Sequence, residues 1–108
     1  MAHRSLVHHI ENYKSLQDLI TINQFVVVDF SAGWCKPCKD IGPIYEELSK
    51  QYTNWTFCKV DVDLVPDAAE SFCVNLLPTF VFIKDGKVVN TFEGANSEKL
   101  NLYLHSNY

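Results

Sequence analysis

The 108-residue sequence contains no long apolar run, no basic cluster and no signal-like N-terminus. No stretch approaches the ~20 apolar residues that a membrane-spanning helix needs, and residues 1–10 lack the continuous apolar core of a secretory signal. The net charge is −4, with acidic and basic residues interspersed, so no face is predicted to bind nucleic acid or an anionic membrane. We therefore expect a cytoplasmic protein that binds neither nucleic acid nor membrane.

The sequence also lacks repeats, low-complexity tracts and linker-like segments. This absence and the length predict a single domain over residues 1–108. A hydrophobic fraction of 47% is enough for one core to fold without structural disulfide bonds. The four cysteines are therefore expected to serve redox or metal chemistry rather than structural cross-linking.

The alternation of apolar patterns predicts an α/β fold. Residues 25–30 are apolar except for one Asp, which is typical of a central strand covered on both faces. Asp85-Gly86 predicts a hairpin turn, and Ser15-Leu16-Gln17-Asp18 reads as the capping box of the first helix. Strands are expected at 6–10, 25–30, 55–62, 79–83 and 87–92, and helices at 15–20, from 35 to about 52 through Pro43, at 66–73 and at 96–104. Two crossover units and a hairpin give a three-layer α/β/α sandwich around a mixed five-stranded sheet with four helices.

Cys35 and Cys38 form a Cys-x-x-Cys pair at the start of the long helix. Positions i and i+3 lie on one helix face, so the two sulfurs can bond after little movement. The unpartnered N–H groups at the helix start favour a negative sulfur and should lower the pKa of the Cys35 thiol. Because the thiolate is the attacking species in disulfide exchange, we predict Cys35 as the nucleophile and Cys38 as the resolving thiol.

A zinc site or a purely structural pair are the alternatives to redox chemistry. Zinc would need two more ligands, for which Cys58 and Cys73 are the candidates. Cys58 lies within a predicted strand, where it is expected to be a buried and inert thiol, and the histidines show no metal-ligand spacing. We therefore expect no metal site.

The residues from Val28 to Lys39, with Trp34-Cys35-Lys36-Pro37-Cys38 at their centre, resemble the active-site signature of the thioredoxin family. Leu77-Pro78-Thr79-Phe80 and Gly94-Ala95-Asn96 recur at that family's spacing, so the resemblance covers essentially the whole chain. It implies a thioredoxin fold, a cis Leu77–Pro78 bond and reduction of protein disulfides. It also implies a monomer without bound cofactor that receives electrons from NADPH through a separate thioredoxin reductase. The implied clients are peroxiredoxin, ribonucleotide reductase and methionine sulfoxide reductase.

Asp29 is the most informative polar residue outside the motif. A carboxyl within an apolar strand should be desolvated, which raises its pKa. The family carries a buried Asp at this position in a proton-transfer role, and Asp29 is expected to accept the proton of Cys38. The alternative is an inert, hydrogen-bonded Asp at a strand end. Lys59, in the neighbouring strand, is expected to pair with Asp29 and moderate its pKa, or else to be a solvated lysine.

Lys36 departs from the family pattern, which has Gly at this position. A unit charge ~6 Å from the Cys35 sulfur is worth about 0.7 kcal/mol in water and would raise the reduction potential on the order of 15 mV. The alternative is that Lys36 points into solvent and is screened. Pro37 and Pro78 complete the residues expected to tune the redox properties.

An apolar rim around the sulfur is predicted to bind clients. Its expected members are Trp34, Pro37, Leu77, Gly94 and Ala95, with the backbone of Leu77 free to pair with an extended client strand. Two other functions stay open at this point. One is a more oxidising or isomerase-like protein of the same fold, and the other is a non-catalytic binding module, against which the intact pair of cysteines counts.

Overall fold

The central strand is β2 (Phe25–Ser31), and the rest of the sheet is built outward from it. The computed structural model describes residues 6–108. The sheet order is β1-β3-β2-β4-β5, with β1, β3 and β2 parallel and β4 and β5 antiparallel. The other elements are β1 (His8–His9), α1 (Tyr13–Ile22), α2 (Lys36–Gln51), β3 (Thr56–Asp61), α3 (Pro66–Ser71), β4 (Thr79–Lys84), β5 (Lys87–Glu93) and α4 (Ser97–His105).

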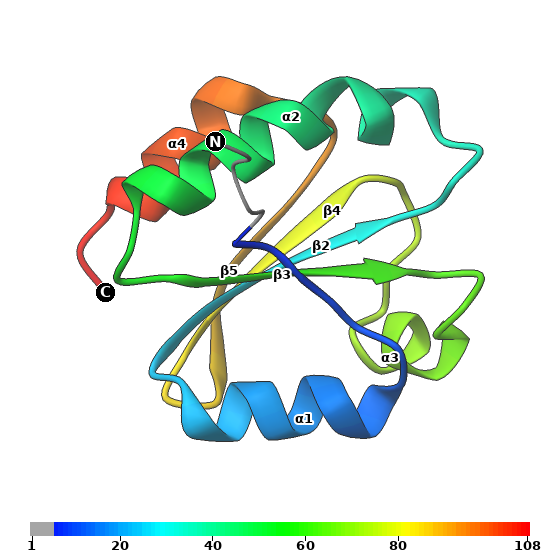
Figure 1. Ribbon diagram of the computed structural model, residues 1–108, viewed down its shortest axis with the longest axis horizontal. Helices are drawn as coiled ribbons and strands as arrows, with labels where there is room; N and C mark the ends of the chain where they lie inside the picture. Colours follow the sequence, from blue (N-terminus) through cyan, green and yellow to red (C-terminus); the bar gives the residue numbers. More distant parts are fainter. Residues whose placement is uncertain (1–5) are drawn as a thin grey trace, which may run out of the picture.

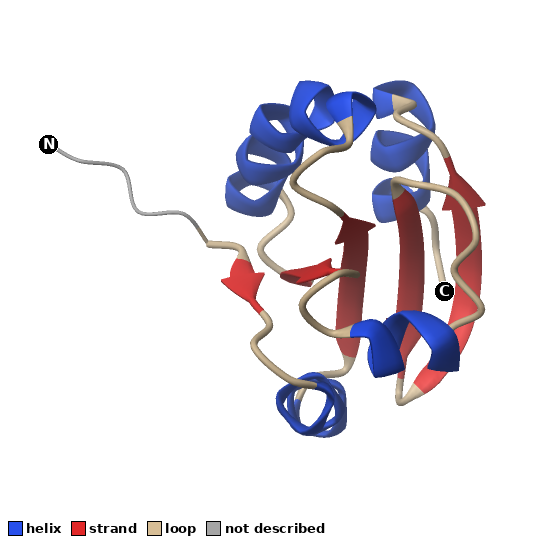
Figure 2. Ribbon diagram, turned by 90° about the vertical axis from the view of Figure 1, so that its right-hand side faces the viewer, coloured by secondary structure: helices blue, strands red, loops and turns tan. Residues whose placement is uncertain are grey.

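Two helical layers cover the sheet, as the element order predicted. Helices α2 and α4 lie over one face, and α1 and α3 lie over the other (Figures 1 and 2). Successive side chains of β2 point to opposite faces, so Val27 packs in the core under α2 and α4. Val26, Val28 and Phe30 enter the core on the side of α1 and α3. The unbroken apolar run of β2 is therefore the consequence of burial on both faces.

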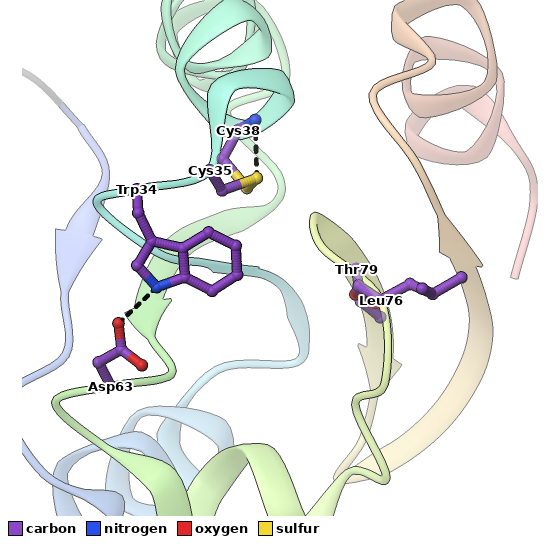
Figure 3. The surroundings of a disulfide bond; sticks show 6 residues. All are labelled: Trp34, Cys35, Cys38, Asp63, Leu76 and Thr79. Atoms are coloured by element: carbon purple, nitrogen blue, oxygen red, sulfur yellow. Dashed lines mark hydrogen bonds between the residues drawn. A yellow bond between two sulfur atoms is a disulfide. The ribbon is translucent and has the colours of Figure 1, made fainter.

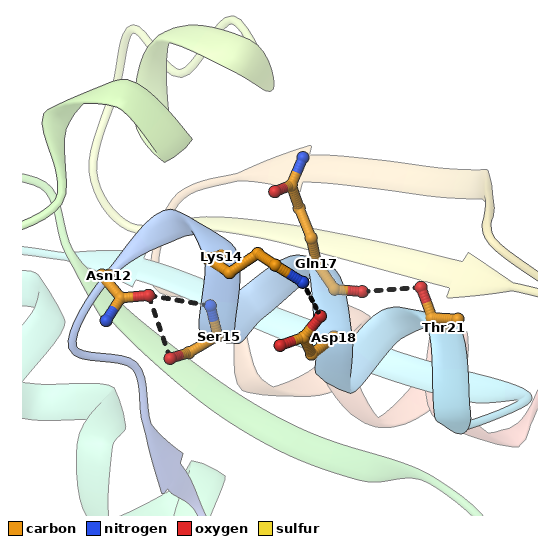
Figure 4. A network of polar contacts seen from close by, with 6 residues as sticks. All are labelled: Asn12, Lys14, Ser15, Gln17, Asp18 and Thr21. Atoms are coloured by element: carbon orange, nitrogen blue, oxygen red, sulfur yellow. Dashed lines mark hydrogen bonds and ion pairs between the residues drawn. The ribbon is translucent and has the colours of Figure 1, made fainter.

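The capping-box prediction for the first helix was wrong. Helix α1 begins at Tyr13, and Asn12 is its N-cap: the Asn12 side-chain oxygen accepts from the Ser15 N–H at 2.9 Å and from the Ser15 hydroxyl at 3.0 Å (Figure 4). The short Asn carboxamide reaches the amide three residues on, so it caps the helix one turn earlier than Ser15 could. Asn96 caps α4 in the same way, by accepting from the Lys99 N–H at 2.9 Å.

Local backbone conformation explains two other boundaries. Cys73 has a φ of +55°, which is incompatible with helix continuation, and α3 ends at Ser71 rather than at Cys73. Asp85 (φ +51°) and Gly86 (φ +78°) are both left-handed, as a two-residue hairpin turn of type I′ requires. The hairpin prediction is confirmed. Within residues 6–108, no helix combines the length and apolar character needed to cross a bilayer.

Candidate active site

The two motif cysteines lie at the start of α2, above the carboxyl end of β2. Cys35 is the N-cap residue of the helix, and it forms a disulfide with Cys38, with a Cα–Cα distance of 5.3 Å. The Cys38 N–H donates to the Cys35 sulfur at 3.3 Å (Figure 3). A sulfur in this position receives an N–H that lacks a helical partner, and it lies at the positive end of the helix dipole. The predicted nucleophile geometry is therefore present.

Asp29 is fully buried, and neither of its carboxyl oxygens has a hydrogen-bond partner among the described residues. Burial raises the pKa of Asp29 from 3.8 to about 7, although the charge of Lys59 partly opposes this shift. Lys59 is the register partner of Asp29 on β3, but the expected direct pairing is absent, because among residues 6–108 the Asp29 carboxyl accepts no hydrogen bond; the Lys59 charge lowers the Asp29 pKa only from a distance. A carboxyl with a pKa near 7 can both accept and return a proton at neutral pH. Among residues 6–108 the carboxyl has no hydrogen-bond partner, so the hydrogen-bonded state that the alternative required is not observed.

A pocket of about 420 Å³ opens beside the deeper cysteine. Ser31, Cys38, Lys59 and Asp61 are among its lining residues. Ser31 follows Asp29 by two positions on β2, so both lie on the sheet face that α2 covers. The pocket therefore offers water a place beside the resolving thiol, on the sheet face that also carries Asp29, although Asp29 itself does not line it.

A second cavity, of about 510 Å³, lies beside the Cys35 sulfur and is here called the client groove. It is lined by Trp34, Cys35, Lys36, Pro37, Val62, Ala69, Val74, Asn75, Leu76 and Leu77. The Leu77–Pro78 bond is cis, as the resemblance implied. Gly94 does not line the groove but lies next to Pro78, because its N–H donates to the Pro78 carbonyl at 2.8 Å. Ala95, the following residue, is exposed.

Trp34 is held by a residue that the sequence did not single out. The indole is 70% exposed, and its Nε1–H donates to the Asp63 carboxylate at 2.8 Å (Figure 3). Leu76, 61% exposed in the groove wall, was also missed. Its position directly before Leu77 was the only available signal, while nothing in the sequence linked Asp63 to Trp34 across 29 positions.

Lys36 is paired along the helix rather than directed only into solvent. Its Nζ donates to both carboxylate oxygens of Asp40, at 3.1 and 3.0 Å. The two side chains are 83% and 60% exposed, so solvent screens the pair. The i, i+4 spacing of Lys36 and Asp40 could have revealed this contact from the sequence.

The other two cysteines do not join the site. The buried Cys58 thiol donates to the Val27 carbonyl at 3.5 Å, and burial raises its pKa well above the ordinary value. Cys73 is exposed and lies two residues after the end of α3. Over residues 6–108, no three His, Cys, Asp or Glu side chains are grouped so that they could hold a metal ion.

Comparison with known proteins agrees with this geometry. The thioredoxin family model matches residues 6–106. Thioredoxin of Homo sapiens is 45% identical over 97 residues, which cover 88% of this chain and 92% of that protein. A solved structure of Plasmodium falciparum thioredoxin has 42% identity and a TM-score of 0.89, covering 91% of this chain and 96% of the other.

A further structural neighbour comes from a study of "the thiol resolving mechanism in yeast mitochondrial 1-Cys peroxiredoxin via glutathione/thioredoxin systems". It has 35% identity and a TM-score of 0.88, and the match covers 94% of this chain and 97% of that one. These matches and the disulfide at the helix start identify a thiol-disulfide oxidoreductase, and they do not favour a scaffold without redox chemistry. This chain belongs to the thioredoxin family.

Proposed function

We propose that this protein is a dithiol electron donor that reduces disulfides of client proteins and is itself reduced by a separate thioredoxin reductase at the expense of NADPH. The observation that carries the proposal is the Cys35 sulfur at the N-cap of α2, which receives the Cys38 N–H and is within bonding distance of the Cys38 sulfur. The protein needs no bound cofactor, because both electrons transferred to the client come from its own two thiols.

The exchange proceeds in two steps. The Cys35 thiolate attacks one sulfur of the client disulfide, which forms a mixed disulfide and expels the other client sulfur as a thiolate. Cys38 then loses its proton and attacks the Cys35 sulfur, which releases the second client thiolate and leaves the Cys35–Cys38 disulfide. Asp29 accepts the Cys38 proton through water in the adjoining pocket, since its pKa of about 7 makes it a competent base at neutral pH. Lys59 moderates that basicity.

The client groove supplies the binding surface. Trp34, Pro37 and Leu77 provide apolar contact beside the sulfur, with Gly94 and Ala95 at the rim next to Pro78. Among residues 6–108, neither the N–H nor the carbonyl of Leu77 has a hydrogen-bond partner. These groups can therefore pair with an extended client segment, as an added β-strand would. Such contacts are sequence-tolerant and suit a protein that serves several clients.

The proposed clients are peroxiredoxin, ribonucleotide reductase and methionine sulfoxide reductase, and the proposed compartment is the cytoplasm. Support for peroxiredoxin comes from the neighbouring structure whose description names this protein class. The reducing cytoplasm suits a dithiol reductant that also carries an exposed thiol at Cys73. We propose that the protein acts as a monomer and passes electrons between the reductase and its clients.

The test is covalent trapping. Cys38→Ser should leave each client attached to Cys35, because the mixed disulfide can no longer be resolved. The reduced variant, immobilised and incubated with a cell extract, should release its clients only on addition of dithiothreitol. Cys35→Ser/Cys38→Ser is the matched control. Recovery of the same proteins from both variants, or an inactive wild type in the insulin-reduction assay with dithiothreitol, would contradict the proposal.

A further inference from the structure

Trp34 has little to fix its orientation apart from one hydrogen bond. With 70% of its surface exposed, the indole gains little from packing, and the polar contact that orients it is the bond from Nε1–H to the Asp63 carboxylate at 2.8 Å. Figure 3 shows the ring lying beside the disulfide, with its nitrogen directed toward Asp63. The placement of this ring at the client groove therefore depends on where the Asp63 carboxylate is held.

Asp63 lies in an exposed turn between β3 and α3, so no regular element fixes it. Asp61, the last residue of β3, holds this turn through both its side chain and its backbone. Its carboxylate Oδ1 accepts from the Asp63 N–H at 2.9 Å. Its carbonyl accepts from the Leu64 N–H at 3.1 Å and from the Val65 N–H at 2.9 Å. Three successive amides of the turn thus converge on one residue.

Asp61 is itself anchored to the sheet. It is the register partner of Ser31 at the end of β2, and the Val62 N–H donates to the Ser31 carbonyl at 2.9 Å. Ser31 precedes Trp34 by only three residues, so the same sheet edge fixes both ends of the contact. The chain of contacts runs from the sheet through Asp61 and Asp63 to the indole.

We propose that Asp61 is a positioning residue that holds Trp34 at the client groove by orienting Asp63. The inference rests on the client-binding role proposed above for Trp34. The required property of Asp61 is an acceptor oxygen at the δ position rather than a negative charge. Asn carries the same oxygen at the same place, whereas Ala carries none.

The first test measures the indole directly. In ¹⁵N spectra of the oxidised protein, Asp61→Ala should speed exchange of the Trp34 Nε1–H with water at least threefold, as loss of a net hydrogen bond implies. Asp61→Asn should leave the exchange rate unchanged. Trp55 is the internal reference, because its Nε1–H donates to the Leu104 carbonyl, remote from the turn, at 3.1 Å. Unchanged Trp34 exchange in Asp61→Ala would overturn the proposal, as would equal effects of the Ala and Asn substitutions.

The second test separates positioning from sulfur chemistry. Reduction of insulin by Asp61→Ala should slow roughly three- to tenfold. Reduction of dithiobis(2-nitrobenzoate), which is too small to need the indole surface, should slow less. Because Asp61 also lines the pocket beside Cys38, the readout is the ratio of the insulin rate to the dithiobis(2-nitrobenzoate) rate, which should fall in Asp61→Ala. Equal slowing with both disulfides would place the effect at the sulfurs and refute the proposal. Asp61→Gln, which displaces the acceptor by one methylene, supplies the same comparisons if thermal melting shows that the Ala variant does not fold.

A third variant distinguishes failure of this inference from failure of the proposed role of Trp34. Trp34→Ala should slow insulin reduction at least as much as Asp61→Ala does. If Trp34→Ala reduces insulin at the wild-type rate, the client-binding role of Trp34 fails. The positioning role of Asp61 is then still decided by the exchange measurement.

Discussion

Replacement of Asp29 by Asn should stabilise the protein, and more so at alkaline than at acidic pH. The folded-state pKa of about 7 lies above the ordinary value of 3.8, so between these values the folded protein keeps a proton that the unfolded chain has released. The free energy of unfolding contributed by this group therefore falls as the pH rises from about 4 to about 7, and stays low above that range. Asn cannot ionise, which removes this penalty.

The size of the effect follows from the two pKa values. We integrate the difference in bound protons between the folded and unfolded states from pH 5 to pH 8.5. The free energy of unfolding gained by Asp29→Asn should then be about 3 kcal/mol larger at pH 8.5 than at pH 5. Guanidinium unfolding of the oxidised protein, followed by far-ultraviolet circular dichroism at both pH values, measures it. Asp85→Asn is the matched control, since it removes an exposed carboxyl from a left-handed turn position that Asn tolerates. It measures how much the loss of a surface carboxyl by itself changes the free energy of unfolding at each pH.

The same substitution should affect catalysis in the opposite direction. Without a base for the Cys38 proton, resolution of the mixed disulfide at pH 7 should slow at least tenfold. The rate should recover as the pH rises and Cys38 ionises without help. A stability gain independent of pH, together with unchanged turnover at pH 7, would refute the assignment of Asp29 as a buried, titrating base.

Two other substitutions test the electrostatics of the motif and the core. Lys36→Gly removes the charge next to Cys35, so the midpoint of the Cys35 thiolate absorbance titration at low salt should rise by about half a pH unit. Asp40→Asn removes the more distant carboxylate that offsets Lys36 and should lower the midpoint by less. Superimposable curves for all three proteins would show that the pair is fully screened. Tyr45→Phe removes a buried hydroxyl that donates to two main-chain carbonyls, one on β2 at 3.0 Å and one on β3 at 2.7 Å. The substitution should lower the free energy of unfolding by about 1–3 kcal/mol and leave insulin reduction unchanged. An unchanged denaturation midpoint would contradict this reasoning.

Helix packing departed from the sequence pattern at one position. The i, i+3, i+4 spacing in the sequence of α2 predicts that Ile44 shares one core-facing side of the helix with Ile41, Tyr45 and Leu48, and those three are buried. Ile44 is 41% exposed, because the sheet and α4 cover only part of the stripe that the i, i+3, i+4 pattern marks out. Periodicity gives the direction of a face but not the width of the surface that covers it.

Short-range chemistry was determined by the sequence itself. The helix start that activates Cys35, the spacing that lets Cys38 reach it and the Asp85-Gly86 hairpin depend on residues within a few positions of one another. Burial of Asp29 followed from the apolar strand around it, because a continuous apolar run implies cover on both faces. These features need only local geometry and hydrophobic pattern, which are properties of the chain.

Contacts between distant residues were decided only by the tertiary structure. The bond between Trp34 and Asp63 spans 29 positions, and it exists because parallel pairing of β2 with β3 places the loops after both strands at the same sheet edge. The client groove likewise needs α2, α3 and the segment before β4 to meet beside one sulfur. The register of the strands and the docking of the helices set these distances. No local sequence pattern encodes them, because many other residues of similar polarity could equally have been the partner of Trp34.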